Sequence, residues 1–142
     1  MMAVPAELVG AKTLAPGRLH AMSFREDLEG ICSRVGGAFA ASVMGFDGIP
    51  IETVDPKPPA GVDLQTLLIE YSSLLHQVRL AAETLQMGKA TEVSIRTERM
   101  VAVARMLTPD YFVVVALDPD GNVGRARYEL RIQGGKLAAL LT

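Results

Sequence analysis

Residues 64–87 have the sequence LQTLLIEYSSLLHQVRLAAETLQM, and this stretch decides the expected fold more than any other. Its apolar residues recur in alternating steps of four and three, which is the spacing of one face of an α-helix. This stripe consists of Leu64, Leu68, Tyr71, Leu75, Val78, Ala82 and Leu85, with Leu67, Leu74 and Ala81 in a second stripe beside it. A helix that covers one sheet needs an apolar band only about 100° wide. The wider band predicts that the helix covers its own sheet and also meets a second copy of the chain, as in a homodimer.

Three strands are expected after this helix, which Gly88 ends. Their residues are 91–97, 100–107 and 111–117. The first run alternates apolar and polar residues, whereas the last, YFVVVAL, is apolar throughout and is expected at the centre of a sheet. Because the connections are short enough for hairpin turns, the three strands are predicted to form an antiparallel meander.

A shorter helix is expected nearer the N-terminus. Ser23 and Glu26 have the S-x-x-E spacing of a capping box, which places the start of this helix at Ser23, and its apolar face runs to a stop at Gly36. Residues 1–22 contain prolines and glycines without a sustained period, and we expect a disordered tail there. The folded domain is therefore predicted to span residues 23–142.

Two strands joined by a tight turn are expected between the two helices. Their residues are 38–46 and 49–54. Asp47-Gly48 is the strongest short-range signal for a two-residue hairpin turn, and Pro50, which lacks an amide proton, places the second strand at a sheet edge. Such a turn sets Phe46 and Ile49 opposite each other at the edge, where large apolar side chains suit an interface. Packing of both side chains under the first helix is an equally good interpretation.

Residues 123–133 fit both a strand and a helix. Apolar and charged residues alternate from Ala126 to Ile132, as they do in a half-buried strand. One face of a helix, broken near Gly134-Gly135, is also formed by Val123, Ala126, Leu130, Leu137 and Leu141. The period alone slightly favours the strand.

The composition indicates one globular domain. The chain has 142 residues, of which 49% are apolar, and its 16 acids and 14 bases give a net charge of -2. This balance argues against a protein that binds nucleic acid over its whole face. No apolar run approaches the roughly 20 residues that a membrane span needs, and a single cysteine favours a reducing compartment such as the cytoplasm.

No residues form a recognisable catalytic or cofactor-binding motif. The glycine-rich loops that cradle phosphates are absent from the sequence. His20 and His76 have no Cys or His at metal-ligand spacing, and His76 is expected to be a solvated helix residue. Cys32 lies among apolar residues, where it should pack as a small hydrophobic side chain. We therefore expect a protein that acts by contact, with no catalytic residue, cofactor or metal.

Charge is distributed unevenly along the chain. Residues 23–70 carry eight acids against three bases, whereas Glu129 is the only acid near Arg125, Arg127, Arg131 and Lys136. This asymmetry suits electrostatic steering between copies or onto a partner, and a solvated charged face explains it as well. A nucleic-acid site on the three arginines is a further alternative, which would show a steep salt dependence.

The order of the expected elements resembles the Roadblock (dynein light chain) family, which is related to the longin fold. The likeness rests on SFREDLE at 23–29, Gly37-Ala38 before the first strand, VMGFDGI at 43–49 and the turn at 118–121. It covers about residues 23–142. Within the family, the bacterial gliding-motility branch is the most similar, on SVMGFDGI at 42–49, AAETL at 81–85 and TPDYF at 108–112.

This resemblance implies an α+β sandwich in which a five-stranded antiparallel sheet carries the long helix on one face and the N- and C-terminal helices on the other. It favours the helix for residues 123–133. It also implies that the third strand and the long helix meet their copies across a two-fold axis. The expected dimer interface consists of Leu67, Tyr71, Leu74, Val78, Ala81, Val93 and Ile95.

The resemblance further implies a non-catalytic homodimeric adaptor that binds a second Roadblock protein of the MglB type. Through that partner it would modulate a Ras-like small GTPase of the MglA type that sets cell polarity and gliding motility, in the cytoplasm or at a cell pole. We expect Phe46, Asp47 and Ile49 to dock the partner. The competing hypothesis is a small-molecule sensor or an enzyme subunit on a longin-like fold, which would need a polar pocket with converging titratable groups.

Overall fold

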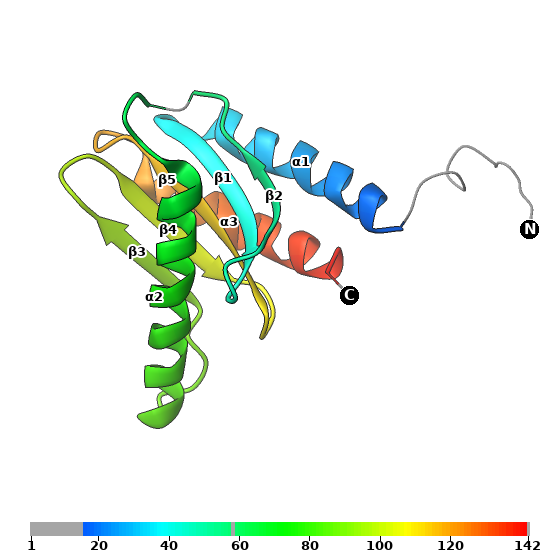
Figure 1. Ribbon diagram of the computed structural model, residues 1–142, viewed down its shortest axis with the longest axis vertical. Helices are drawn as coiled ribbons and strands as arrows, with labels where there is room; N and C mark the ends of the chain where they lie inside the picture. The colour runs from blue at the N-terminus through cyan, green and yellow to red at the C-terminus, as the bar shows by residue number, and fades with distance from the viewer. Residues whose placement is uncertain (1–15, 58, 142) are drawn as a thin grey trace, which may run out of the picture.

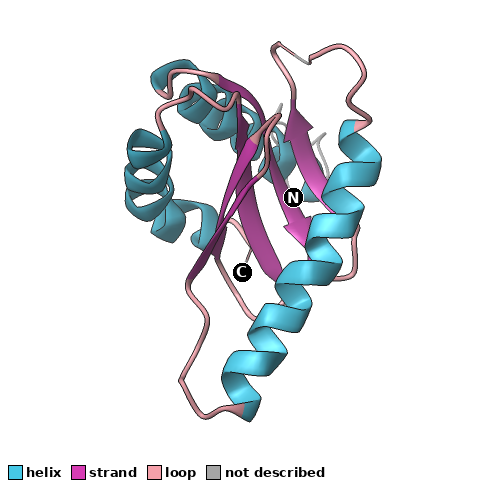
Figure 2. Cartoon of the chain, turned by 90° about the vertical axis from the view of Figure 1, so that its left-hand side faces the viewer, coloured by secondary structure: helices cyan, strands magenta, loops and turns pink. Residues whose placement is uncertain are grey.

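The computed structural model describes residues 16–57 and 59–141, with side chains from Phe24 onward. Its elements are α1 (Pro16–Arg34), β1 (Ala38–Gly45), β2 (Pro50–Val54), α2 (Leu64–Thr84), β3 (Glu92–Arg96), β4 (Val101–Met106), β5 (Tyr111–Leu117) and α3 (Val123–Ala139). The five strands form one sheet in the order β2-β1-β5-β4-β3, and all neighbouring strands are antiparallel. Helix α2 lies on one face of this sheet, and α1 and α3 lie on the other (Figures 1 and 2). The predicted α+β sandwich is confirmed.

The position of each strand follows from its residues. β5 lies at the centre of the sheet, where Val113 and Val115 join the core beneath α1 and α3 while Phe112 and Val114 join the core beneath α2. A strand with helices over both faces must be apolar at every position, as its sequence predicted. β2 lies at an edge, in agreement with the missing amide proton of Pro50.

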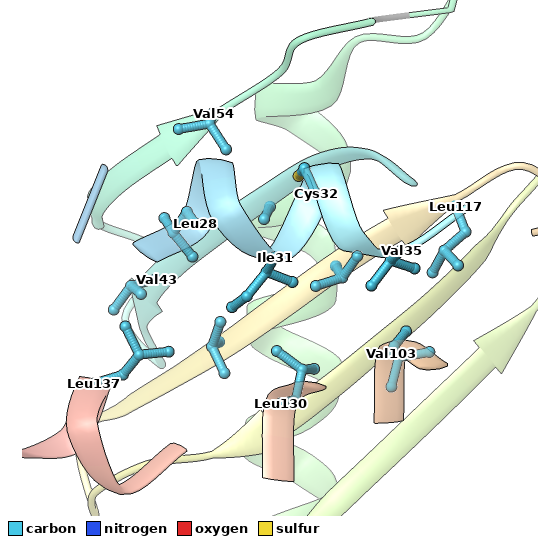
Figure 3. Close-up of a cluster of buried hydrophobic side chains, with 14 of the residues drawn as sticks. Leu28, Ile31, Cys32, Val35, Val43, Val54, Val103, Leu117, Leu130 and Leu137 are labelled. Carbon is cyan, nitrogen blue, oxygen red and sulfur yellow. The ribbon is translucent and has the colours of Figure 1, made fainter. Parts of the chain in front are cut away.

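The core beneath α1 and α3 is built mostly from aliphatic side chains of both helices and the sheet (Figure 3). Leu28 and Ile31 of α1 and Leu130 of α3 are almost completely buried. Cys32 is only 7% exposed and packs with them, as predicted. Burial, assisted by the negative charge of Glu29, raises the pKa of the Cys32 thiol to about 11.

Residues 123–133 are helical, so the helix implied by the resemblance is correct and the strand favoured by the period is not. The side chain of Asn122 caps α3 by accepting a hydrogen bond from the Arg125 amide at 3.0 Å. Gly134, expected to break the helix, lies buried within it. A Cβ at this position would lie 3.4 Å from Arg105 Nε, which is an ordinary van der Waals contact.

Both long helices differ from their predicted bounds. α1 begins at Pro16 instead of Ser23, because proline suits the first position of a helix and the capping box signal lies inside the helix. Residues 1–15 of the predicted tail lie outside the described residues. α2 ends at Thr84, before the expected stop at Gly88, since Gln86 already has a left-handed backbone with φ of 56°.

Candidate interaction surfaces

Helix α2 buries only a narrow line of side chains against the sheet. This line consists of Leu68, Ser72 and Leu75. On the predicted dimer stripe, Leu74 and Val78 remain 46% and 39% exposed. Leu67 and Tyr71 are half-buried and line a hollow together with Met100, which precedes β4. The exposed stripe therefore runs along the side of α2 that faces the β3–β4 end of the sheet.

Strand β3 forms the sheet edge next to this stripe. It pairs with β4, and its other edge has no strand partner among the described residues. Val93 and Ile95 are half-buried and pack against the same core cluster as Leu67 and Tyr71. The structure thus brings the predicted dimer residues of α2 and β3 to one side of the molecule, with Ala81 exposed on the same stripe.

The hairpin between β1 and β2 differs from the prediction. The Gly45 amide donates to the Ile49 carbonyl oxygen at 2.9 Å, and the Gly48 amide donates to the Gly45 carbonyl oxygen at 3.0 Å. The turn therefore has three residues, and the expected two-residue turn with Phe46 opposite Ile49 is wrong. Gly48 adopts φ of +89°, and Asp47 Oδ1 accepts a hydrogen bond from the Ile49 amide at 3.0 Å. Three-residue hairpin loops commonly place a glycine in this left-handed position.

The side chain of Phe46 points under α2. Its ring centroid lies 5.2 Å from that of Phe112 and 6.3 Å from that of His76, and Arg79 Cζ lies 4.1 Å above the ring. Ile49 points outward and is 63% exposed. Neither interpretation of the hairpin holds for both residues, because Phe46 is half-buried beneath the long helix instead of the first one and only Ile49 is free to bind.

His76 and Arg79 form a pair that sequence reasoning missed. His76 is half-buried instead of solvated, and its Nδ1 lies 3.0 Å from Arg79 Nη2. Among the described residues, no carboxylate forms an ion pair with Arg79, whose Nε is buried without a hydrogen-bond partner. The two residues are three apart on α2, and this spacing was the only signal in the sequence. Their contacts hold Phe46 in place behind the turn.

A groove of about 260 Å³ lies between β2 and α2, beside the hairpin. Its lining is mostly apolar and includes Met44, Pro50, Leu64, Leu68 and Ile69. Ile69 is 46% exposed, and its Cγ2 would lie 3.8 Å from a Cβ at Gly48. Exposed apolar surface therefore continues from the hairpin to α2. Ile69 was missed because it lies outside the heptad stripe, on the opposite side of the helix.

Comparison with known proteins decides the family. No family model matches the chain, and no curated protein sequence matches it. Among solved structures, MglC from Myxococcus xanthus has 48% sequence identity and a TM-score of 0.61, with 83% of this chain and 98% of that chain covered. A Roadblock/LC7 domain from Streptomyces avermitilis has 14% identity and a TM-score of 0.70, with 82% and 95% covered. The chain belongs to the Roadblock/LC7 family.

This Roadblock chain also shares its fold with MglB, whose structure is described as having a tetrameric arrangement. That match has 21% identity and a TM-score of 0.73, with 85% of this chain and 89% of MglB covered. The resemblance to the Roadblock family and to its bacterial gliding-motility branch, drawn from the sequence, is thereby confirmed by MglC and MglB.

Many of the charged side chains behind the uneven charge distribution form ion pairs within the Roadblock domain. Glu129 is buried and accepts from Arg34 at 2.8 Å and from Arg125 at 2.9 Å. The remaining pairs of α3 are Arg127 with Glu92 and Lys136 with Asp27. Because the bases of α3 largely meet acids of the same chain, less charge is left for the nucleic-acid site considered from the sequence.

Two further features are absent from the described part of the Roadblock domain, a cluster of metal-ligating side chains and a helix able to span a membrane. Within it, no three His, Cys, Asp or Glu side chains are grouped so that they could hold a metal ion. None of the helices that the structure describes is long and apolar enough to cross a membrane. The features that stand out are exposed apolar surfaces on α2 and at the hairpin.

Proposed function

We propose that this Roadblock protein is a non-catalytic homodimeric adaptor. It binds another Roadblock protein of the MglB type and so modulates a Ras-like small GTPase of the MglA type in cell polarity and gliding motility. The observation that carries the proposal is the exposed apolar stripe of α2 beside the open edge of β3. The 48% identity to MglC supports a place in the same polarity system.

The dimer follows from the surface that one chain leaves uncovered. Full burial of a Leu or Val side chain is worth about 1.5–3 kcal/mol, and Leu74 and Val78 have much of this burial still to gain. The open edge of β3 presents backbone amides and carbonyls that a second β3 can pair. A two-fold axis beside α2 and β3 would bury both features at once, with each copy offering the same surface.

The partner site lies around the β1–β2 hairpin, at the β2 edge of the sheet and away from the β3 edge. Ile69 is exposed and lines the apolar groove together with Gly48 and Pro50, the two chain neighbours of the exposed Ile49. Asp47 is exposed at the tip of the turn. Phe46 contributes from behind, because its packing against Phe112 fixes the position of the turn. A large apolar side chain of the partner would fill the groove beside Ile69, while Ile49 would be covered at the turn.

Binding of a purified MglB-type Roadblock protein tests this function. Wild-type chain and partner should form a complex in titration calorimetry. Joint replacement of Phe46, Asp47 and Ile49 by alanine should abolish binding and leave the mass of the dimer in light scattering unchanged. If the affinity of this variant equals that of wild type, the hairpin is not the partner site.

A further inference from the structure

The outward face of α3 carries an apolar patch that neither the proposed dimer nor the hairpin site uses. Tyr128 and Ile132 lie one helical turn apart and are 45% and 56% exposed. The inward face of the same helix is already buried against the core without them, since Ala126, Leu130 and Leu137 are at most 1% exposed. We propose that Tyr128 and Ile132, with Arg125 and Arg131 at their rim, form a second docking surface for an acidic amphipathic helix of a partner protein.

The rim of this patch is basic. Arg125 Cζ lies 5.4 Å and Arg131 Cζ lies 5.7 Å from the centroid of the Tyr128 ring, so both guanidinium groups gather at one aromatic side chain. Arg131 forms no ion pair with any residue that the structure describes, and Arg125 shares Glu129 with Arg34. Tyrosine and arginine around an aliphatic centre are the residue types that dominate binding energy at protein interfaces.

The charge of the surroundings selects an acidic partner. The acids that contact α3 are already engaged, because Glu129 meets two arginines, Glu92 meets Arg127 and Asp27 meets Lys136. The guanidinium group of Arg131 is left as positive charge beside an apolar surface. A helix with apolar residues on one face and Asp or Glu at its margins complements both the apolar patch and its basic rim.

A protein occupant fits this patch better than a nucleic acid does. Ile132 has no aromatic ring for base stacking, so Tyr128 alone of the two patch residues offers one. The ion pairs of Arg125 and Arg127 reduce the charge available to phosphates.

The patch also lies where an adaptor needs a separate site. α3 and α2 are on opposite faces of the sheet (Figures 1 and 2), so occupation of α3 leaves the α2 stripe free. A dimer built through α2 and β3 would carry two such patches. The protein could then hold a partner at the hairpin and another at α3 at the same time.

The test uses the full-length chain and two labelled peptides in fluorescence anisotropy. The first is an 18-residue designed helix with leucines on one face and glutamates at the margins, and the second has lysine in place of every glutamate. The glutamate peptide should bind at least about tenfold more tightly than the lysine peptide, and Arg131→Glu should narrow or invert this preference. A labelled 20-nucleotide single-stranded DNA is the third probe.

Matched variants show whether binding occurs at the patch. Tyr128→Ala and Ile132→Ala should each weaken the glutamate peptide on the order of tenfold, whereas Ile49→Ala, an exposed residue at the hairpin, should leave it unchanged. Thermal melts monitored by circular dichroism check that each variant is folded. The proposal would be overturned if the glutamate peptide does not bind or if both peptides bind with equal affinity. It would also be overturned if the DNA binds more tightly than the glutamate peptide, or if neither patch variant changes the affinity for that peptide.

Discussion

Replacement of Ile49 by alanine separates docking from folding at the hairpin. The change removes three carbon atoms, worth about 2.4 kcal/mol when fully buried at about 0.8 kcal/mol each. Because Ile49 is 63% exposed in the free chain, a partner can still provide most of that burial. We expect a loss of about 1.5 kcal/mol in binding, which is roughly a tenfold increase in Kd. The cost to the stability of the free chain should stay below about 1 kcal/mol.

Phe46→Ala should behave differently, because this side chain supports the turn from behind. Its ring packs against Phe112 and beneath Arg79. A fully buried Phe→Ala change costs about 3–5 kcal/mol, so we expect about 2 kcal/mol from a half-buried ring. Loss of binding in this variant would therefore come with a lower midpoint of thermal unfolding.

The assay is calorimetric titration with the MglB-type partner, together with thermal unfolding of each free variant. Ile132→Ala serves as the control, since this residue is 56% exposed on α3, which lies on the face of the sheet opposite α2. It should leave the Kd of this partner unchanged. The reasoning is refuted if Ile49→Ala keeps the wild-type Kd within about twofold, the limit set by a few tenths of a kcal/mol.

Three further predictions concern the dimer stripe, the buried thiol and one glycine. Leu74→Glu should shift the dimer to monomers in light scattering, whereas Leu80→Glu, equally exposed at 46% but outside the stripe, should not; equal masses for the two variants would count against the stripe. Cys32 should react with iodoacetamide at pH 8 far more slowly than in the unfolded chain. The pKa of this thiol is raised from 9.0 to about 11 in the folded chain, so the thiol of the unfolded chain loses its proton at lower pH. The free energy of unfolding should therefore fall as the pH rises from 9.0 to about 11, and a free energy that does not change with pH would contradict the burial. Gly37→Ala should cost more than about 1 kcal/mol of stability by chemical denaturation, because φ is +84° and a Cβ would lie 2.5 Å from Gly121 Cα, while Gly36→Ala has open space and should cost little; similar costs would reject the explanation.

The sequence was informative wherever burial acts on a whole element. β5 is apolar throughout because helices cover both of its faces, and the edge position of β2 follows from the missing amide proton of Pro50. The wide apolar band of α2 corresponds to a buried line with Leu74 and Val78 exposed beside it. These features depend on local pattern alone, so one sequence suffices to predict them.

The hairpin could not be predicted, because the direction of Phe46 depends on where α2 crosses the sheet. A local turn signal contains no information on this tertiary contact, and His76 was misplaced for the same reason. The sequence pattern did not identify α3 as a helix, because of the residues on its exposed face. Tyr128 and Ile132 add apolar positions on the outward face, which produces the strand-like alternation. The misleading pattern therefore lies at the residues that we propose as a docking surface.

The mass of the wild-type chain in solution tests the homodimer most directly. Multi-angle light scattering at micromolar concentration should give about twice the chain mass of 15.2 kDa, because the α2 stripe and the open edge of β3 are then covered by a second copy. A single species of 15.2 kDa across the micromolar range would contradict the proposed dimer.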